Sequence, residues 1–96
     1  MSKLPKKIRV IGKDYKVIST NRIEHFGECC HGKLKIKINR RQDKQQLKDT
    51  VVHEILHAID YSMQLDLEEH QVHTMATGLH AVLSDNPEFS KWLVES

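Results

Sequence analysis

The spacing of apolar residues changes at about residue 43, and this change constrains the fold more than any other feature of the sequence. Before that point, apolar residues alternate with lysine and arginine, the period of a strand with one buried face. After it, apolar residues recur every three or four positions, the period of an amphipathic helix. Strands therefore precede helices, and the 96 residues predict a single α+β domain over residues 1–96.

The strand half should form a small sheet. The cleanest alternation covers residues 33–38, where lysines separate leucine and isoleucine. Residues 25–30 are expected to pair with it through a turn near Gly32, and residues 8–17 supply an earlier alternating stretch interrupted by a turn. We expect three or four antiparallel strands with one apolar face.

Three helices are expected to follow. Asp43 is a suitable N-cap for the first, with Gln46 at the capping-box position, and the apolar pattern continues to about residue 61 or 63. A second helix starts after Asp66 and continues to about residue 84, and Pro87 opens a short third one. The apolar side of the third helix, expected to anchor it in the core, consists of Phe89, Trp92 and Leu93.

The sequence His53-Glu54-x-x-His57 lies inside the first predicted helix. Residues i and i+4 lie above one another on a helix, so the two imidazoles can share one Zn²⁺ ion at about 2.0–2.1 Å. Glu54 is turned by about 100° from His53 and would flank the ion, where a carboxylate can act as general base toward water. The alternative is a pair of surface histidines on a solvated helix face.

A catalytic zinc site usually has a third protein ligand. Glu69 stands at the start of the second predicted helix, and an antiparallel return would bring it near the first helix, so we prefer it as this ligand. His73, His70 and Glu68 remain alternatives, and His73 could instead orient a ligand. A competing explanation for Glu69 is a capping box that starts at Asp66.

The order of these residues resembles that of the small zinc metallopeptidases of the ImmA/IrrE and minigluzincin type. The matching pattern is His53-Glu54-x-x-His57 followed by Glu69-x-x-Val72-x-x-x-Ala76-x-x-Leu79. The resemblance covers roughly residues 33–84 and implies a minimal zincin-like fold with Glu69 as third zinc ligand. It also implies hydrolysis of a protein or peptide substrate, with Glu54 as base. Many proteins of this type are encoded by phages and other mobile elements.

The chain departs from that family pattern at three positions. Val72 and His73 stand where Ala-Asn is typical, and Met75 stands where phenylalanine is typical. A histidine close to the expected metal bears directly on which side chains bind it. The departures therefore keep His73 in consideration as a ligand.

Charge and composition exclude several classes of partner. A formal net charge of +2 is too small to indicate nucleic acid or a membrane surface, and the basic strand residues lack a series of interleaved aromatics, with Tyr15 alone among them. No apolar run approaches the roughly 20 residues that span a bilayer, and Met1–Pro5 lack the apolar core of a signal peptide. With two adjacent cysteines, Cys29 and Cys30, and no disulfide framework, we expect a cytoplasmic protein.

Other polar residues offer weaker candidates. Cys29, Cys30 and His31 could bind a metal, but no second cysteine pair completes such a site, and a strand end with a turn is the simpler explanation. Tyr61 could donate to a developing oxyanion, although packing against the sheet also explains it. An extended substrate is expected to add to the sheet edge at residues 33–39.

The rival function is a zinc-stabilised protein-binding or regulatory module without turnover. Such a module needs zinc ligands but has no use for a glutamate at position 54, whereas hydrolysis requires a base there. Glu54 therefore favours the enzyme.

Overall fold

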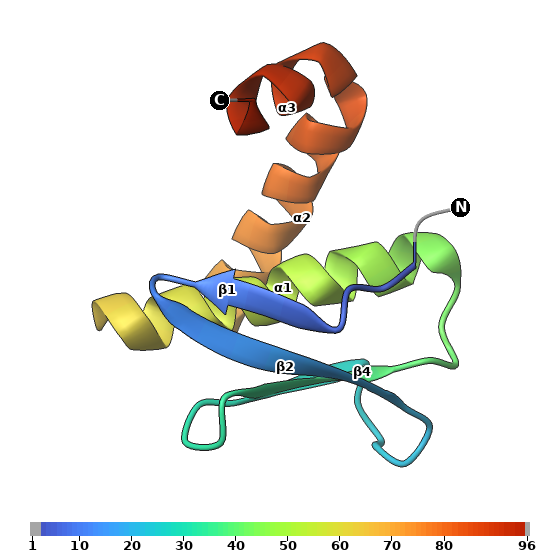
Figure 1. Cartoon of the computed structure of the whole chain (residues 1–96), viewed down its shortest axis with the longest axis vertical. Coiled ribbons are helices and arrows are strands. Elements are labelled where there is room, and N and C mark those ends of the chain that lie inside the picture. The colour runs from blue at the N-terminus through green and yellow to red at the C-terminus, as the bar shows by residue number, and fades with distance from the viewer. Residues whose placement is uncertain (1–2, 96) are drawn as a thin grey trace.

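The chain forms a four-stranded sheet followed by three helices (Figure 1). The computed structural model describes residues 3–95; the outer ends of the predicted domain, residues 1, 2 and 96, lie outside the described residues. The elements are β1 (Lys7–Val10), β2 (Lys13–Thr20), β3 (Gly27–Cys30), β4 (Lys35–Asn39), α1 (Lys44–Met63), α2 (Glu69–Asp85) and α3 (Pro87–Val94). The α+β class and the order of strands before helices are confirmed.

The sheet is mixed, with strand order β1-β2-β4-β3. The β1–β2 and β3–β4 pairs are antiparallel hairpins, as expected. The central β2–β4 pair is parallel, with Val17 opposite Ile36, so the expectation of a wholly antiparallel sheet is wrong for this pair. The β3–β4 hairpin packs with its second strand against β2, and this makes β4 a central strand and leaves β3 at the edge. A substrate cannot add to β4, which corrects the predicted pairing at residues 33–39.

The segment 21–26 carries the chain from β2 past the end of β4 to the far edge of the sheet. Asn39, the last residue of β4, holds this crossing in place. Its side-chain amide donates to the carbonyl oxygens of Ile23 and His25, both at 3.2 Å, and its backbone N–H donates to the Phe26 carbonyl at 2.8 Å. Alternation of apolar residues carries no information on such a crossing, because it describes each strand separately.

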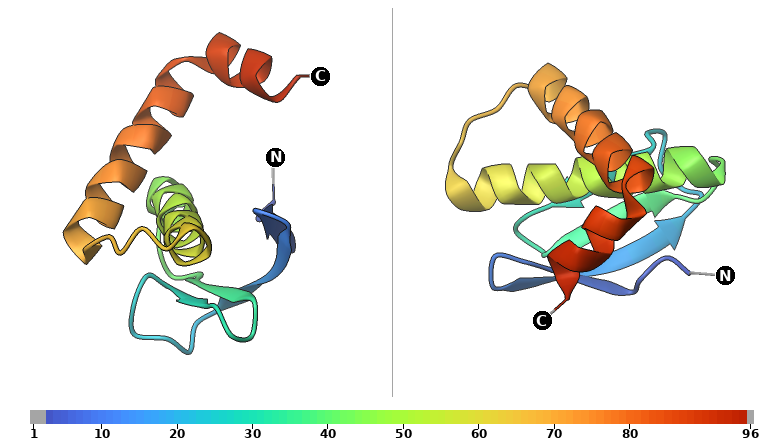
Figure 2. Two further views of the ribbon diagram at one scale, coloured as in Figure 1. Left: turned by 90° about the vertical axis from the view of Figure 1, so that its left-hand side faces the viewer. Right: turned by 90° about the horizontal axis from the view of Figure 1, so that it is seen from above.

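One face of the sheet packs against α1, and the sheet curls around this helix (Figure 2). The buried core residues of this layer are Val10, Tyr15, Val17, Ile36, Ile38 and Ala58. Full burial of each large apolar side chain contributes about 1.5–3 kcal/mol relative to exposure. This layer fixes α1, and with it His53, Glu54 and His57, relative to the sheet.

The limits of α1 follow from local sequence. The Asp43 side chain accepts a hydrogen bond from the Gln46 backbone N–H at 2.8 Å, so the predicted N-cap is confirmed. The helix ends at Met63, and Gln64 follows in the left-handed conformation with φ of 56°. Within residues 3–95, no helix combines the length and the apolar character needed to cross a membrane.

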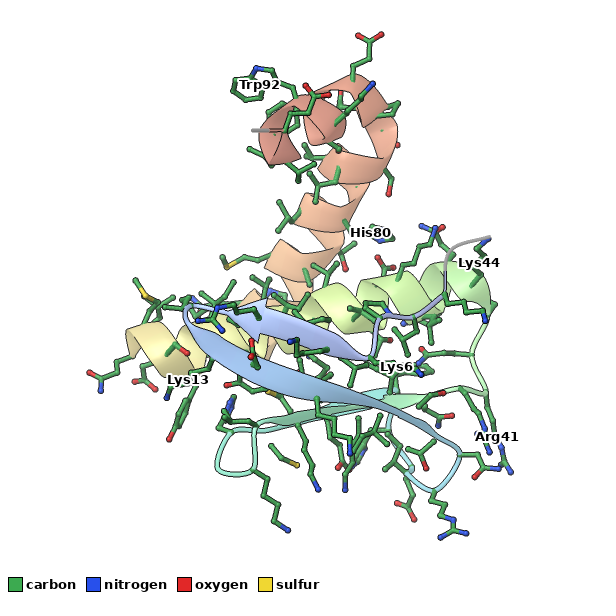
Figure 3. All side chains as sticks on the ribbon, in the orientation of Figure 1. Lys6, Lys13, Arg41, Lys44, His80 and Trp92 are labelled. Atoms are coloured by element: carbon green, nitrogen blue, oxygen red, sulfur yellow. The ribbon has the colours of Figure 1, made fainter. Side chains whose placement is uncertain are left out.

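The last helix, α3, begins with Pro87 as predicted, but it does not anchor in the core. None of its residues is buried, and the Trp92 side chain is 68% exposed (Figure 3). The reason is the course of α2, which leads away from the sheet, so that α3 contacts α2 alone among the described elements (Figures 1 and 2). The expectation that Phe89, Trp92 and Leu93 are core anchors is therefore wrong.

Candidate metal centre

His53 and His57 lie one turn apart on α1 and point to the same side. Their Nε2 atoms are 3.2 Å apart, and both side chains are mostly covered by neighbouring residues. Burial lowers the pKa of His53, while the carboxylate of Glu69 acts in the opposite direction. A lowered pKa favours the neutral imidazole, which is the form that binds metal.

Glu69 is brought to the two histidines by the reversal between α1 and α2. Asp60, near the end of α1, holds this turn, because its carbonyl accepts from the Leu65 N–H at 3.1 Å and its carboxylate from the Leu67 N–H at 3.2 Å. Leu56, Val72 and Ala76 form the buried contact between the helices. The small side chain of Ala76 allows the helices to approach closely. This close approach brings Glu69 within reach of His53 and His57 on α1.

The capping of α2 leaves Glu69 available. The N-cap residue is Glu68, whose backbone N–H donates to the Gln71 side chain at 2.8 Å. The competing capping box from Asp66 to Glu69 does not form. Instead, Glu69 Oε1 lies 2.7 Å from His53 Nε2, and Glu69 Oε2 lies 3.0 Å from His57 Nε2.

The three side chains fit a zinc ion. Four ligands placed tetrahedrally at about 2.0–2.1 Å from zinc are separated from one another by about 3.3 Å. The two Nε2 atoms are 3.2 Å apart, each lies 2.7 or 3.0 Å from a different oxygen of Glu69, and one donor atom from each of the three residues lies within 4.8 Å of the other two. Two imidazoles and one carboxylate are also the donor set of several catalytic zinc sites. Among residues 3–95, this is the one group of three side chains with metal-binding geometry.

The alternative ligands lie outside this group. His73 lies one turn further along α2, and its ring centroid is 6.0 Å from that of His53. Together with His53 and Glu69, it lines a cleft beside the metal centre. His70 and Glu68 are exposed and belong to no metal-binding cluster among the described residues. The geometry therefore groups Glu69, and none of these three, with the two histidines.

Glu54 lies beside the metal centre without belonging to it. Its side chain is 4% exposed and is held between α1 and β3. Burial raises the pKa of Glu54 to about 7, and the negative charges of Glu69 and Glu28 add to the effect. A carboxyl group that exchanges its proton near neutral pH is suited to general acid–base chemistry.

Gly27, at the start of β3, makes room for this carboxylate. A Cβ atom at this position would lie 2.7 Å from Thr50 Cγ2 and 3.0 Å from Glu54 Oε2, closer than side chains tolerate. The sequence analysis did not single out Gly27. The available signal was a glycine at the start of an expected strand, which often marks close approach of other atoms to the backbone.

A part-buried pair, His80 on α2 and Asp49 on α1, was also missed. His80 Nδ1 contacts Asp49 Oδ1, and His80 is 8% exposed (Figure 3). Asp49 lies one helical turn before His53, and His80 lies one turn after Ala76, so the pair joins the two helices that carry the zinc donors. The helical spacing of Glu69, Ala76 and His80 was the only sign of it in the sequence.

The second candidate metal set does not assemble. Cys29 Sγ contacts His31 Nδ1 at 3.5 Å, and burial raises the pKa of Cys29 to about 12, with the negative charge of Glu54 as the next cause. The ring of His31 stacks on that of Tyr61, with centroids 4.2 Å apart. Tyr61 therefore packs on the turn that joins β3 to β4, as a residue of the surface.

A cleft runs beside the metal centre between α1, α2 and the start of β3. Its volume is about 620 Å³, and its lining includes Gly27, His53, Glu54, Glu69 and His73. This volume lies within the range of sites that hold a small ligand or part of a peptide.

Comparison of the chain with protein-family models, with curated proteins and with solved structures finds no match. Function must therefore be argued from the site itself.

Proposed function

We propose that this protein is a zinc-dependent metallopeptidase in which His53, His57 and Glu69 hold the metal and Glu54 is the general base. One observation carries the proposal: a buried carboxylate lies beside the three donors without being one of them. Burial of a carboxylate is costly unless its charge is compensated. A zinc site that served stability alone would gain nothing from such a group, whereas hydrolysis needs it.

The chemistry divides between the metal and the chain. When bound, zinc polarises a peptide carbonyl and lowers the pKa of water. The carboxylate of Glu54 takes a proton from the attacking water and returns it to the nitrogen of the leaving amine. The cleft wall formed by Gly27 and Thr50 keeps the Glu54 side chain in one position, so that the same oxygen atoms serve both steps.

The substrate is expected to be a protein or peptide bound in extended form. The strand that borders the metal centre, β3, is an edge strand, and its residues Gly27, Glu28 and Cys29 line the space next to His53 and His57. An extended chain can pair with the free side of such a strand. We propose the cytoplasm, of a host cell if the protein is phage-encoded, as the compartment, which suits the free thiols of Cys29 and Cys30.

A zinc-stabilised binding module without turnover is the second candidate. It is favoured by the exposed apolar side of α3, which offers a surface for another protein. The two candidates differ in what they require of Glu54, since a binding module would work equally well with an uncharged side chain there.

A peptide-cleavage experiment separates them. Zinc-loaded wild type and Glu54→Gln protein are incubated with a peptide library, and new termini are identified by mass spectrometry. We expect cleavage by the wild type, lost on chelation and restored by zinc, and reduced about 10²–10⁴-fold in Glu54→Gln. Glu24→Gln, the same change at an exposed residue, should cleave like the wild type. Equal cleavage by Glu54→Gln and wild type would exclude Glu54 as the base.

A further inference from the structure

The helix α3 presents an apolar side that nothing in the described chain covers. Phe89, Trp92 and Leu93 share one face at helical spacing, and they are 44%, 68% and 54% exposed. On α2, Met75, Leu79 and Val82 also share one face at helical spacing, and each is nearly half exposed. Monomeric proteins seldom expose a continuous apolar patch of this kind without a binding role.

An eight-residue helix is also too short to be stable by its own hydrogen bonds. Two contacts fix its direction: Asn86 Nδ2 donates to the Val82 carbonyl at 2.9 Å, and Ser90 Oγ donates to the Leu83 carbonyl at 2.7 Å. These bonds hold α3 on the end of α2, away from the sheet (Figure 2). In this arrangement, α3 makes no contact with the sheet or with α1.

A groove of complementary character lies elsewhere on the chain. It lies between the segment before β1, β2 and the start of α1, and has a volume of about 610 Å³. Leu4, Pro5 and Leu47 form its apolar lining, and Lys6, Lys16 and Arg40 surround it. We call this feature the basic groove. Its volume is within the range that accommodates a drug-sized ligand, and so a pair of aromatic side chains.

The charges of the two surfaces match. Glu88 lies at position i−4 from Trp92 on α3, and Asp85 precedes the helix, whereas Glu95 at position i+3 is paired with Lys91 at 4.0 Å. Within residues 3–95, neither Glu88 nor any of the three cations around the basic groove takes part in an ion pair. The apolar side of α3 therefore has the acid Glu88 beside it, and the apolar groove is bordered by bases, an arrangement that can set the orientation between two partners.

We infer that α3 of one molecule binds the basic groove of a second copy, with Phe89 and Trp92 in the groove and Glu88 near its cations. Every copy carries both surfaces, so two molecules can exchange α3 reciprocally, and such an exchange closes the assembly at two molecules. The inference is independent of the metal centre, because neither surface contains a zinc donor or Glu54.

Sedimentation velocity of the full chain over a concentration series tests this assignment. We expect a species of twice the mass of one chain at high concentration, with a shift of Trp92 fluorescence to shorter wavelength as it forms. Trp92→Ser should raise the dissociation constant by at least about 30-fold, as for a central aromatic residue of an interface. Leu65→Ser, a similar change at an exposed residue of the α1–α2 turn, should leave it unchanged.

Charge-reversal variants on the two surfaces provide a second test, which does not depend on whether Trp92→Ser folds. Lys16→Glu and Glu88→Lys should each weaken association about fivefold, and an equimolar mixture of the two variants should recover part of it. Three results would overturn the inference. A monomer at all concentrations, with Trp92 emission typical of an exposed indole, would leave α3 free for another protein. A monomer whose Trp92 emission indicates burial that Lys16→Glu removes would mean that α3 closes onto the groove of its own chain, and a dimer insensitive to all three variants would mean a different interface.

Discussion

Gly27 illustrates how the site depends on a residue without a side chain. Its Cα faces Thr50 and the carboxylate of Glu54 so closely that an added methyl group would contact both. The Glu54 carboxylate can therefore occupy its position only because residue 27 of β3 has no side chain.

Gly27→Ala is expected to lower the free energy of unfolding by about 1–3 kcal/mol, because the added Cβ must displace Thr50 or Glu54. Urea unfolding measures the change. Gly32→Ala is the matched control, since a Cβ there meets nothing within 4 Å. Equal stability of the two variants would mean that β3 and α1 are not as close as described.

Cys29 is expected to be unreactive. Burial raises its pKa to about 12, so almost none of the thiol is in the nucleophilic thiolate form at pH 8. In the variant Cys30→Ser, iodoacetamide should modify Cys29 at least about 100-fold more slowly than an unstructured cysteine peptide. Rates that match once urea has unfolded the variant would confirm that the fold causes the protection, whereas a fast reaction in the folded state would contradict it.

Among the elements, α1 and α2 together carry the zinc donors, and their relative position decides whether Glu69 reaches the histidines. Apolar contacts of Leu56, Val72 and Ala76 join the two helices, and the Asp49–His80 pair joins them on the far side of this contact from Glu69. The pair therefore limits rotation of α2 about that contact.

His80→Ala should lower the free energy of unfolding by about 1–3 kcal/mol, because it leaves Asp49 without its partner. His70→Ala, on the exposed side of the same helix, should change it by less than about 0.5 kcal/mol. Thermal or urea unfolding of the zinc-free proteins distinguishes these outcomes. A His80 variant as stable as the His70 variant would show that the pair does not hold the helices together.

Much of the element structure is predictable from sequence because its signals are local. The Asp43 cap, the Pro87 start and the β3–β4 hairpin each depend on a few adjacent residues, and all three are present. The grouping of His53 with His57 follows from helical spacing, and that of Glu69 from a tight reversal. Whether these side chains bind zinc stays a prediction.

The features that sequence reasoning missed depend on how separate elements meet. The parallel β2–β4 pair results from the insertion of one hairpin beside another, which strand alternation does not encode. The exposure of Trp92 results from the direction of α2, since an apolar helix side predicts a contact but not its partner. Gly27 and the Asp49–His80 pair become visible only when β3, α1 and α2 are packed.

At the scale of the whole molecule, a bound zinc ion would add to a modest core. A domain of 96 residues buries a smaller share of its surface than larger domains do, so its stability is correspondingly limited. An ion shared between α1 and α2 would link the middle of the first helix to the first residue of the second. Its binding free energy therefore contributes to folding.

Removal of zinc should lower the melting temperature by about 10 °C or more, because a ligand at 100–1,000 times its Kd stabilises the native state by about 3–4 kcal/mol. Scanning calorimetry with and without a chelator measures the shift. His57→Ala with zinc should melt like the chelated wild type. Identical melting of the wild type in both conditions would show that the metal does not join the helices.

Zinc content per chain is the most direct measurement of the central claim, that three side chains hold the metal and a fourth serves as base. Protein expressed with zinc and dialysed without chelator is analysed by inductively coupled plasma mass spectrometry. We expect about one zinc per chain in the wild type and in Glu54→Gln, and substantially less in Glu69→Gln. A wild type without zinc, or loss of zinc in Glu54→Gln with retention in Glu69→Gln, would contradict the account.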